Sequence, residues 1–240
     1  MTLVPTKALA QYLQNRGFNN VEVLQRGVDI DLFTPLQRSD ALRRSWGADN
    51  DSIVCIYVGR IAAEKNIHAA VNTVLVLSSH YKIRFVLVGD GPLRKEIQRE
   101  HPDFVFCGTR RGDDLAQHYA SADVLLFPSR TETFGNVVTE SMASGLATVA
   151  YDEAAAHEHI KDFYNGVLAS DAPGHDFTAV TMRLCKQQER IRTIGLNASE
   201  YAKQLGWPAI VARFNSLLHS ICSNPESLNR DEKYNAGAHS

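Results

Sequence analysis

Short apolar runs that resemble β-strands alternate with helical patterns across the middle of this chain. The strand-like runs are Ser52–Val58, Arg84–Val88, Phe104–Phe106, Val124–Phe127 and Thr148–Ala150. The helices expected between and after them are Lys65–Ser79, Pro92–Glu100, Gly112–Ala120 and Asn136–Ser144. Such an alternation is typical of successive strand-helix-strand units, whose strands form a mainly parallel sheet. We therefore expect an α/β fold, with a Rossmann-like parallel sheet and helices on both of its faces.

Both ends of the chain carry patterns of a different kind. At the amino end, Met1–Pro5 and Val21–Leu24 are expected to be strands on either side of a helix at Thr6–Arg16. Two such strands need neighbours in a sheet, so this stretch is interpreted as the remnant of an upstream domain. At the carboxyl end the expected helices are Asp176–Lys186, Arg190–Leu205 and Pro208–Ser220. Ser223–Ser240, which is polar and rich in Asn, is predicted to be a disordered tail.

Composition argues against several classes of partner. The 240 residues include 25 basic and 27 acidic side chains and carry a net charge of −2, so no polycationic face is predicted for nucleic acid. No zinc-binding spacing joins the four cysteines, Cys55, Cys107, Cys185 and Cys222. No run approaches the roughly 20 apolar residues that a membrane-spanning helix requires. We predict a cytoplasmic protein.

The loop after the strand that ends at Val58 is a candidate anion site. It contains Gly59, which allows close backbone approach, and the cations Arg60 and Lys65. Loops at this edge of an open α/β sheet bind ligands. The two cations could converge on one anion at the start of a helix, whose partial positive charge would add to theirs. The pattern indicates a diphosphate clamp, and solvated charges at a helix start are the alternative.

Two further loops follow strands but carry weaker signals. In the second loop, Gly89 and Gly91 bracket Asp90 and permit a tight turn with exposed amides, which suits a sugar or phosphate as well as a plain turn. In the third loop, backbone groups around Cys107 and Thr109 could pair with the edge of a nucleobase. The side chains there supply little chemistry, so a purely structural role is the alternative.

The fourth loop, which follows Phe127, combines two carboxylates with a helix start. Glu132 lies in the loop, and Glu140 lies about one turn into the expected helix. They can therefore contact different parts of one elongated ligand, with Glu132 on sugar hydroxyls and Glu140 on those of a ribose. Taken alone, this spacing of two glutamates is commonplace. The backbone amides that would face an anion or sugar oxygens belong to Phe134, Gly135, Asn136 and Val137.

Taken in order, these loops resemble those of a known family. The stretches VGRIAAEKN, VGDGP, VFCG and PSRTETFGNVVTESMASGLATVA are similar to the carboxy-terminal domain of family 4 retaining glycosyltransferases. This group includes glycogen synthase and phosphatidylinositol mannosyltransferases. Further out, VLQRGVDIDLFTP at 23–35 resembles the interdomain segment of the family, and WPAI at 207–210 resembles its late helix. The resemblance implies one half of a GT-B fold.

The resemblance also implies roles for these residues. Arg60 and Lys65 would grip the diphosphate of a UDP- or GDP-sugar. Glu132 and the amides after it would hold the donor sugar, and Glu140 would bind ribose. Arg60, Lys65 and Glu132 are thus the expected catalytic residues of a retaining transfer by front-face attack. The group generally needs no metal or other cofactor, because cationic side chains and helix amino termini stabilise the leaving diphosphate.

Members of this family are about twice the size of one such domain. An amino-terminal domain supplies their acceptor site, so this chain alone is expected to be inactive. The segments expected are a remnant of that domain with its linker at 1–35, the nucleotide-sugar domain at 36–206, a crossover helix at 207–222 and the tail at 223–240. The expected partners are the nucleotide sugar, the missing amino-terminal domain and a glycan or lipid acceptor of the cell envelope. Any peripheral membrane contact would come through the missing half.

Two other functions fit parts of the pattern. A sugar-nucleotide epimerase with this fold would convert its substrate without an acceptor, and a noncatalytic module would bind nucleotide sugar or mediate protein contacts. A phosphorylase would need a lysine for pyridoxal phosphate, which nothing marks. A metal site at His157 and His159 is not expected, because residues two apart on a helix face different sides. The sequence leaves the base, sugar, acceptor and oligomeric state open.

Overall fold

The computed structural model describes residues 1–132 and 134–223, which divide into two compact units. The first unit combines Met1–Gly27 with the chain from Gly206 onward, and the second unit is Val28–Leu205. The segment expected as the interdomain linker therefore ends inside the second unit, where Val28 and Phe33 are buried in the core. The tail predicted at 223–240 lies outside the described residues, except for Ser223 at the end of the last helix.

The first unit is small and contains the two strands expected near the amino end. Strands β1 (Thr2–Val4) and β2 (Val21–Val23) pair in parallel and flank helix α1 (Lys7–Gln14) in the chain. Helix α10 (Trp207–Ser223) completes the unit, and its Arg213 forms an ion pair with Glu22 at 3.0 Å. The two strands are thus each other's neighbours.

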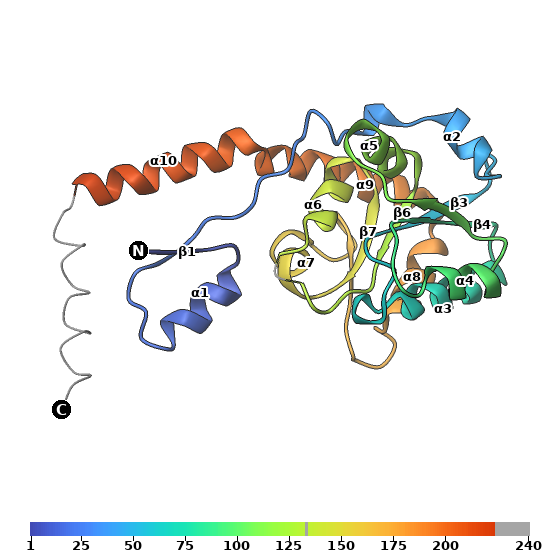
Figure 1. The fold of residues 1–240 in the computed structure, drawn as a ribbon, viewed down its shortest axis with the longest axis horizontal. Coiled ribbons are helices and arrows are strands. Elements are labelled where there is room, and N and C mark those ends of the chain that lie inside the picture. The colour runs from blue at the N-terminus through green and yellow to red at the C-terminus, as the bar shows by residue number, and fades with distance from the viewer. Residues whose placement is uncertain (133, 224–240) are drawn as a thin grey trace. The chain divides into compact units, whose positions relative to one another are not determined.

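The second unit is built on a six-stranded parallel sheet, as the sequence predicts (Figure 1). Its strands, in spatial order, are β5 (Val105–Gly108), β4 (Ile83–Val88), β3 (Ile53–Val58), β6 (Val124–Phe127), β7 (Ala147–Tyr151) and β8 (Val167–Ala169). The chain starts at the centre with β3, moves outward to β5, and then crosses back to β6 on the other side of β3. This reversal places the loops after β3 and β6 next to each other, at the point where such sheets bind ligands.

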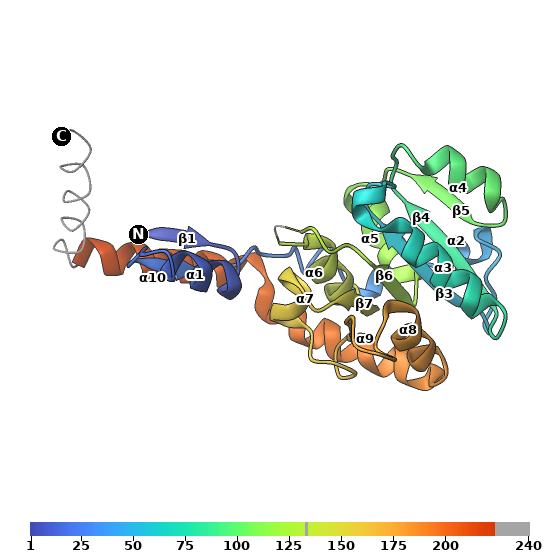
Figure 2. The same cartoon turned by 90° about the horizontal axis from the view of Figure 1, so that it is seen from below.

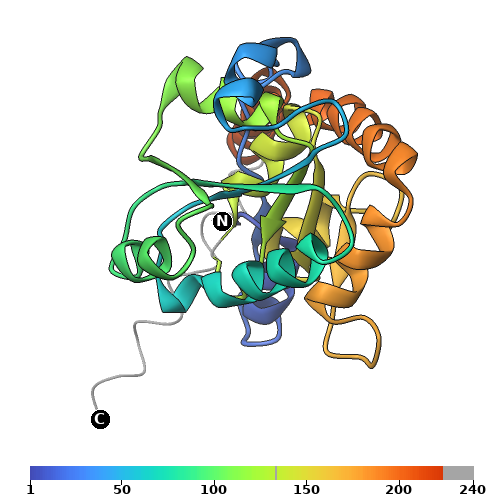
Figure 3. The same cartoon turned by 90° about the vertical axis from the view of Figure 1, so that its right-hand side faces the viewer.

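Helices cover both faces of this sheet. They are α2 (Asp40–Ser45), α3 (Ile67–Ser78), α4 (Arg94–Glu100), α5 (Gly112–Ser121), α6 (Asn136–Ala143), α7 (Ala154–His159), α8 (Phe177–Cys185) and α9 (Gln188–Ala202). Short 3-10 turns occur at Pro35–Gln37, Ala63–Lys65 and Lys203–Leu205. Figure 2 shows α3 and α8 in front of the strands, and Figure 3 shows the strands between teal α3 and green α5.

Alternation of side chains along β3 divides the core into two parts. Val54 and Ile56 point to one face and pack with residues of α5 and α6, such as Met142. Cys55 and Tyr57 point to the other face and pack with residues of α3 and α8. Because both faces are covered, the strand is apolar throughout, as is usual for a central parallel strand. The sheet is therefore a rigid base for the loops at its edges.

Two helices begin later than their sequence patterns suggest. After β3 the chain makes a 3-10 turn, and Asn66 follows with a left-handed backbone of φ 54, so α3 starts at Ile67 rather than at Lys65. Helix α4 starts at Arg94, which leaves Pro92 in the preceding turn and not in the first turn of the helix. In both cases the loop is longer than predicted, because its residues contact a neighbouring loop.

Candidate functional site

The loops that follow β3, β4 and β5 lie against one another at the carboxyl edge of the sheet. The amide of Gly89 donates to the carbonyl of Gly108 at 2.8 Å. A Cβ atom on Gly89, whose φ is 138, would lie 1.9 Å from the carbonyl oxygen of Gly59. One on Gly91 would lie 2.3 Å from the carbonyl oxygen of Ile61. These glycines thus have a packing role, because larger residues would force the loops apart.

The two cations of the first loop contact different carboxylates. Lys65 Nζ lies 2.7 Å from Glu132 Oε1, and both side chains are mostly buried, at 27% and 19% exposed. Arg60 instead pairs with Glu64 at 2.7 Å, where both side chains are exposed. The hydroxyl of Tyr57 donates to the carbonyl of Arg60 at 2.7 Å and fixes the backbone of the loop. Lys65 and Glu132, predicted separately from two loops, are therefore direct partners.

Further hydrogen bonds join the first loop to the fourth. The side-chain amide of Asn66 donates to the carbonyl of Pro128 at 3.2 Å. The hydroxyl of Thr131 donates to the carbonyl of Glu64 at 3.1 Å. Together with the ion pair, these contacts hold the loops after β3 and β6 as one wall.

The start of α6 lies directly after this wall. Gly135 is its N-cap, with φ 92, and no side chain caps the helix. The side chain of Phe134 is buried, and its carbonyl accepts a hydrogen bond from the amide of Ala155 at 2.8 Å. The predicted group of Phe134, Gly135, Asn136 and Val137 thus lies at this uncapped helix start, and its contact with a ligand stays a prediction. Uncapped amides at a helix start favour an anion or sugar oxygens.

Glu140 lies in the second turn of α6, and a tyrosine holds its carboxylate. The hydroxyl of Tyr119 on α5 donates to Glu140 Oε2 at 3.1 Å. Burial raises the pKa of the Glu140 carboxyl, and this hydrogen bond opposes part of the shift. Tyr119 is fully buried and packs edge-on against Phe33 at 5.8 Å. The sequence reasoning missed Tyr119, because nothing local distinguishes it from a core aromatic residue.

The third loop contacts the second loop through Gly108, and the hydrogen bonds of its Arg110 are local. The carbonyl of Cys107 accepts a hydrogen bond from Arg110 Nε at 2.9 Å, and Arg110 also pairs with Asp114 at 2.9 Å. Burial raises the pKa of the Cys107 thiol. Thr109 is exposed. Within the described residues, no hydrogen bond or ion pair links this loop to Lys65 or the two glutamates, so its proposed contact with a base stays a prediction.

Arg130 is a second residue of the site that the sequence reasoning missed. Its guanidinium stacks on the ring of Tyr151 at 3.6 Å and pairs with Asp171 and, at 3.7 Å, with Glu153. Hydrogen bonding to Asp171 raises the pKa of Arg130. The residue therefore ties the loop after β6 to those after β7 and β8. Its partners lie 21 to 41 positions away in sequence, so no local pattern could have identified it.

A buried hydroxyl in the same loop lacks a partner. Ser129 is 5% exposed, and its Oγ makes no hydrogen bond to any residue within 1–132 and 134–223. Since buried polar groups are normally paired, this unpaired hydroxyl is an exception beside the loop that contains Glu132. The sequence signal is its place in PSRTE, three residues before Glu132.

The described part of the chain shows no group of three metal-ligating side chains. His157 instead pairs with Asp152 at 2.9 Å. Across the same residues, no helix has both the length and the apolar character needed to cross a membrane.

Comparison with known proteins identifies the family. Residues 52–187, more than half of the chain, match the family described as Glycosyl transferases group 1. The chain belongs to this family. A GDP-mannose-dependent alpha-mannosyltransferase of Mycobacterium tuberculosis is 39% identical over 167 residues, which cover 70% of this chain and 43% of that protein. The sulfoquinovosyl transferase SQD2 of Arabidopsis thaliana is 31% identical over 229 residues, which cover 92% of this chain and 44% of that protein.

Solved structures share the fold of this group 1 chain. Sucrose-phosphate synthase from Thermosynechococcus elongatus has a TM-score of 0.78 at 22% identity, covering 92% of this chain and 58% of that one. Anabaena HepE, solved with UDP and glucose, has a TM-score of 0.75 at 22% identity, covering 91% and 62%. The sheet is accordingly one Rossmann-like domain of a GT-B fold. The chain spans less than half the length of the two curated relatives named above.

Proposed function

We propose that this chain binds the nucleotide-diphosphate sugar of a retaining, metal-independent glycosyl transfer to a glycan or lipid. The observation that carries the proposal is the ion pair between Lys65 and Glu132 beside the uncapped start of α6. At this edge of the sheet, the cation and the free amides suit a diphosphate, and the carboxylate suits the hydroxyls of a sugar. Family membership supports the reaction class.

The diphosphate is the group that this arrangement fits best. Lys65 pairs with Glu132 in the loop that leads into α6, and Arg60 is on the same loop as Lys65. A bound diphosphate would replace Glu132 as the partner of Lys65 and receive hydrogen bonds from the amides. Glu132 would then be free to accept hydrogen bonds from the donor sugar. Arg60 and Lys65 would stabilise the charge that develops on the leaving diphosphate.

Glu140 is the proposed ribose ligand. Its carboxylate lies in the second turn of α6, and Tyr119 fixes the orientation of one oxygen. The other oxygen, Oε1, has no hydrogen-bond partner among the described residues and could accept hydrogen bonds from vicinal hydroxyls. Gly59, Gly89 and Gly91 would act indirectly, by keeping the loops close together.

The whole reaction needs groups beyond this chain. We propose that an amino-terminal domain supplies the acceptor site, that the chain alone is inactive, and that the reaction occurs in the cytoplasm as part of cell-envelope glycan synthesis. GDP-mannose is the first donor to test, because three similar proteins at 34% to 39% identity are described as GDP-mannose-dependent. UDP-sugars are the second choice.

Calorimetric titration of the chain with GDP-mannose, GDP and UDP tests this proposal. Saturable binding of one nucleotide is expected, weakened at least about tenfold by Lys65→Ala or Glu140→Ala, since hydrogen bonds to charged groups contribute about 1.5–3 kcal/mol. Lys95→Ala, an exposed lysine on α4, is the matched control and should bind like the parent. Equal affinity for Lys65→Ala and the parent would overturn the site. Conversion of the sugar without any acceptor would instead indicate an epimerase.

A further inference from the structure

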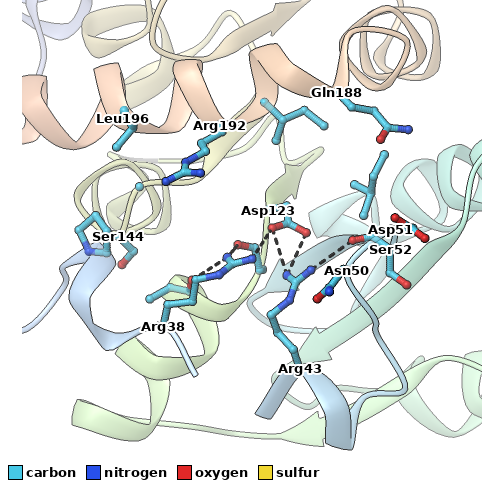
Figure 4. A pocket seen from close by; sticks show the side chains of 16 residues that line it. Arg38, Arg43, Asn50, Asp51, Ser52, Asp123, Ser144, Gln188, Arg192 and Leu196 are labelled. Atoms are coloured by element: carbon cyan, nitrogen blue, oxygen red, sulfur yellow. Dashed lines mark hydrogen bonds and ion pairs between the residues drawn. The ribbon is translucent and has the colours of Figure 1, made fainter. Parts of the chain in front are cut away.

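A cavity of about 500 Å³ lies at the amino edge of the six-stranded sheet, at the opposite end of the strands from the loops described above (Figure 4). Ser52 and Asp123, which directly precede β3 and β6, line its floor. Its other walls come from α2 and the segment before it, the ends of α5 and α6, and the first turns of α9. Cavities of this size are typical of small-molecule sites.

One wall of the cavity is built from two arginines that share an aspartate. Arg38 and Arg43 lie 3.0 Å and 2.9 Å from the carboxylate of Asp123. Both guanidiniums also donate to backbone carbonyls, such as that of Ala122 at 3.1 Å from Arg38. Asp123 Oδ2 accepts a further hydrogen bond from the amide of Val54 at 2.8 Å. This wall is therefore rigid, and its two positive charges exceed the single negative one.

The facing wall carries polar groups that have no partner. Arg192 projects from α9 toward the cavity, and the described residues offer it no hydrogen bond or ion pair (Figure 4). Ser144, at the end of α6, is 2% exposed, and its hydroxyl has no hydrogen-bond partner in the described part of the chain. Gln188 lies in the first turn of α9, a 15-residue helix without a side-chain cap. A buried hydroxyl without a partner needs an explanation, and a bound molecule would supply one.

The charges of the lining select an anion. Its charged side chains are Arg38, Arg43, Arg192, Asp51 and Asp123, so three positive charges face two negative ones. The partial positive charge at the start of α9 adds to this excess. Of the three arginines, Arg192 alone lacks a hydrogen-bond or ion-pair partner among the described residues. A guanidinium binds a phosphoryl or carboxyl group through two parallel hydrogen bonds.

We propose that this cavity binds the phosphoryl or carboxyl group of a small polar metabolite, with Arg192 and the Ser144 hydroxyl as its donors. The site is separate from the proposed donor site. Helix α6 runs between the two, with Asn136 at one end and Ser144 next to the other, and its eight residues span roughly 12 Å. The ligand would therefore contact the far end of the helix whose start faces the proposed donor.

Titration of the whole chain with inorganic phosphate, and separately with acetate, followed by amide chemical shifts, tests this inference. Saturable shifts of residues near Ser144 and Gln188 are expected with at least one anion. Phosphate binding alone indicates a phosphoryl ligand, and acetate binding a carboxyl ligand. Arg192→Ala should weaken anion binding at least about tenfold. The affinity of Arg192→Lys should lie between that of Arg192→Ala and that of the parent, because lysine keeps the charge but cannot make two parallel hydrogen bonds.

Two controls keep the outcome interpretable. Arg99→Ala removes an exposed arginine of α4 outside the cavity and should bind the anion like the parent. Ser144→Ala should lose affinity for the anion while its thermal stability in the absence of anion stays equal or rises, because the variant removes an unpaired buried hydroxyl. No saturable shift with either anion, or equal binding by Arg192→Ala and the parent, would overturn the proposal. Neither result bears on nucleotide binding at the carboxyl edge.

Discussion

Replacing Tyr119 with phenylalanine isolates one hydrogen bond at the proposed ribose site. The ring is fully buried and packs against Phe33, and phenylalanine can keep that packing. The change removes only the hydroxyl, which donates to Glu140 Oε2 at 3.1 Å. The carboxylate then loses its one hydrogen-bond partner among the described residues. Because that hydrogen bond holds the pKa of Glu140 down, the variant should also raise this pKa further.

The size of the effect follows from this geometry. A hydrogen bond to a charged group contributes about 1.5–3 kcal/mol, but this one is long for two oxygens, and Glu140 is half-buried, so water can partly replace it. We expect a loss of about 1 kcal/mol in the free energy of unfolding, or about 2–4 °C in Tm for a chain of this size. If the carboxylate also loses its orientation toward ribose, nucleotide affinity should fall about fivefold.

Thermal unfolding and calorimetric titration with GDP and UDP measure the two effects on the same sample. Tyr164→Phe is the matched control, because this tyrosine is exposed, and neither its stability nor its nucleotide affinity should change. A loss of stability without any loss of affinity would separate Glu140 from the nucleotide site. An unchanged Tm together with unchanged affinity would refute the reasoning altogether.

Three further outcomes follow from the structure. Gly89→Ala places a Cβ atom 1.9 Å from a carbonyl oxygen and should lower the free energy of unfolding by more than about 3 kcal/mol. Gly112→Ala is the control, because the space around this glycine is open, and it should lower the free energy of unfolding by about 1 kcal/mol. Urea unfolding compares the two variants. Burial raises the pKa of Glu140 above its ordinary 4.5, so the folded state binds more protons than the unfolded state between these two pKa values. The free energy of unfolding should therefore fall as pH rises from 4.5 through the raised pKa. Glu140→Gln should flatten this pH profile in urea unfolding from pH 4 to 8. Asp123→Ala leaves the buried Arg43 without its carboxylate and should lower the free energy of unfolding by about 3–5 kcal/mol. A loss of under about 1 kcal/mol in urea unfolding would contradict this expectation.

The sequence predicts the sheet well because its signal is local and repeated. Val124–Phe127 matches β6 at both ends, since a buried parallel strand is an uninterrupted apolar run. Two elements were not expected. Strand β8 has only three residues and lies at the edge of the sheet, and α2 has six residues, so neither is long enough to show a period. Short elements depend on the tertiary contacts that surround them.

The site was predicted as a set of residues but not as a set of contacts. Lys65 and Glu132 were each expected to bind donor, yet their direct pairing across 67 positions has no local signature. The same holds for Arg130 and Tyr119, whose partners come from other elements. From the sequence, glycine at position 89 was equally compatible with a turn whose amides face a ligand and with a plain turn. The structure adds a third reason for this glycine, the close contact between two loops. The proposed roles in binding are predictions that these contacts support.

A crystal structure of the chain with bound GDP would locate the donor site. We expect the diphosphate to lie at the start of α6 in contact with Lys65 Nζ, and Glu132 no longer to pair with that amine. Glu140 should contact the ribose hydroxyls while keeping its hydrogen bond from Tyr119. A nucleotide bound away from α6, with the 2.7 Å pair of Lys65 and Glu132 intact, would contradict this expectation.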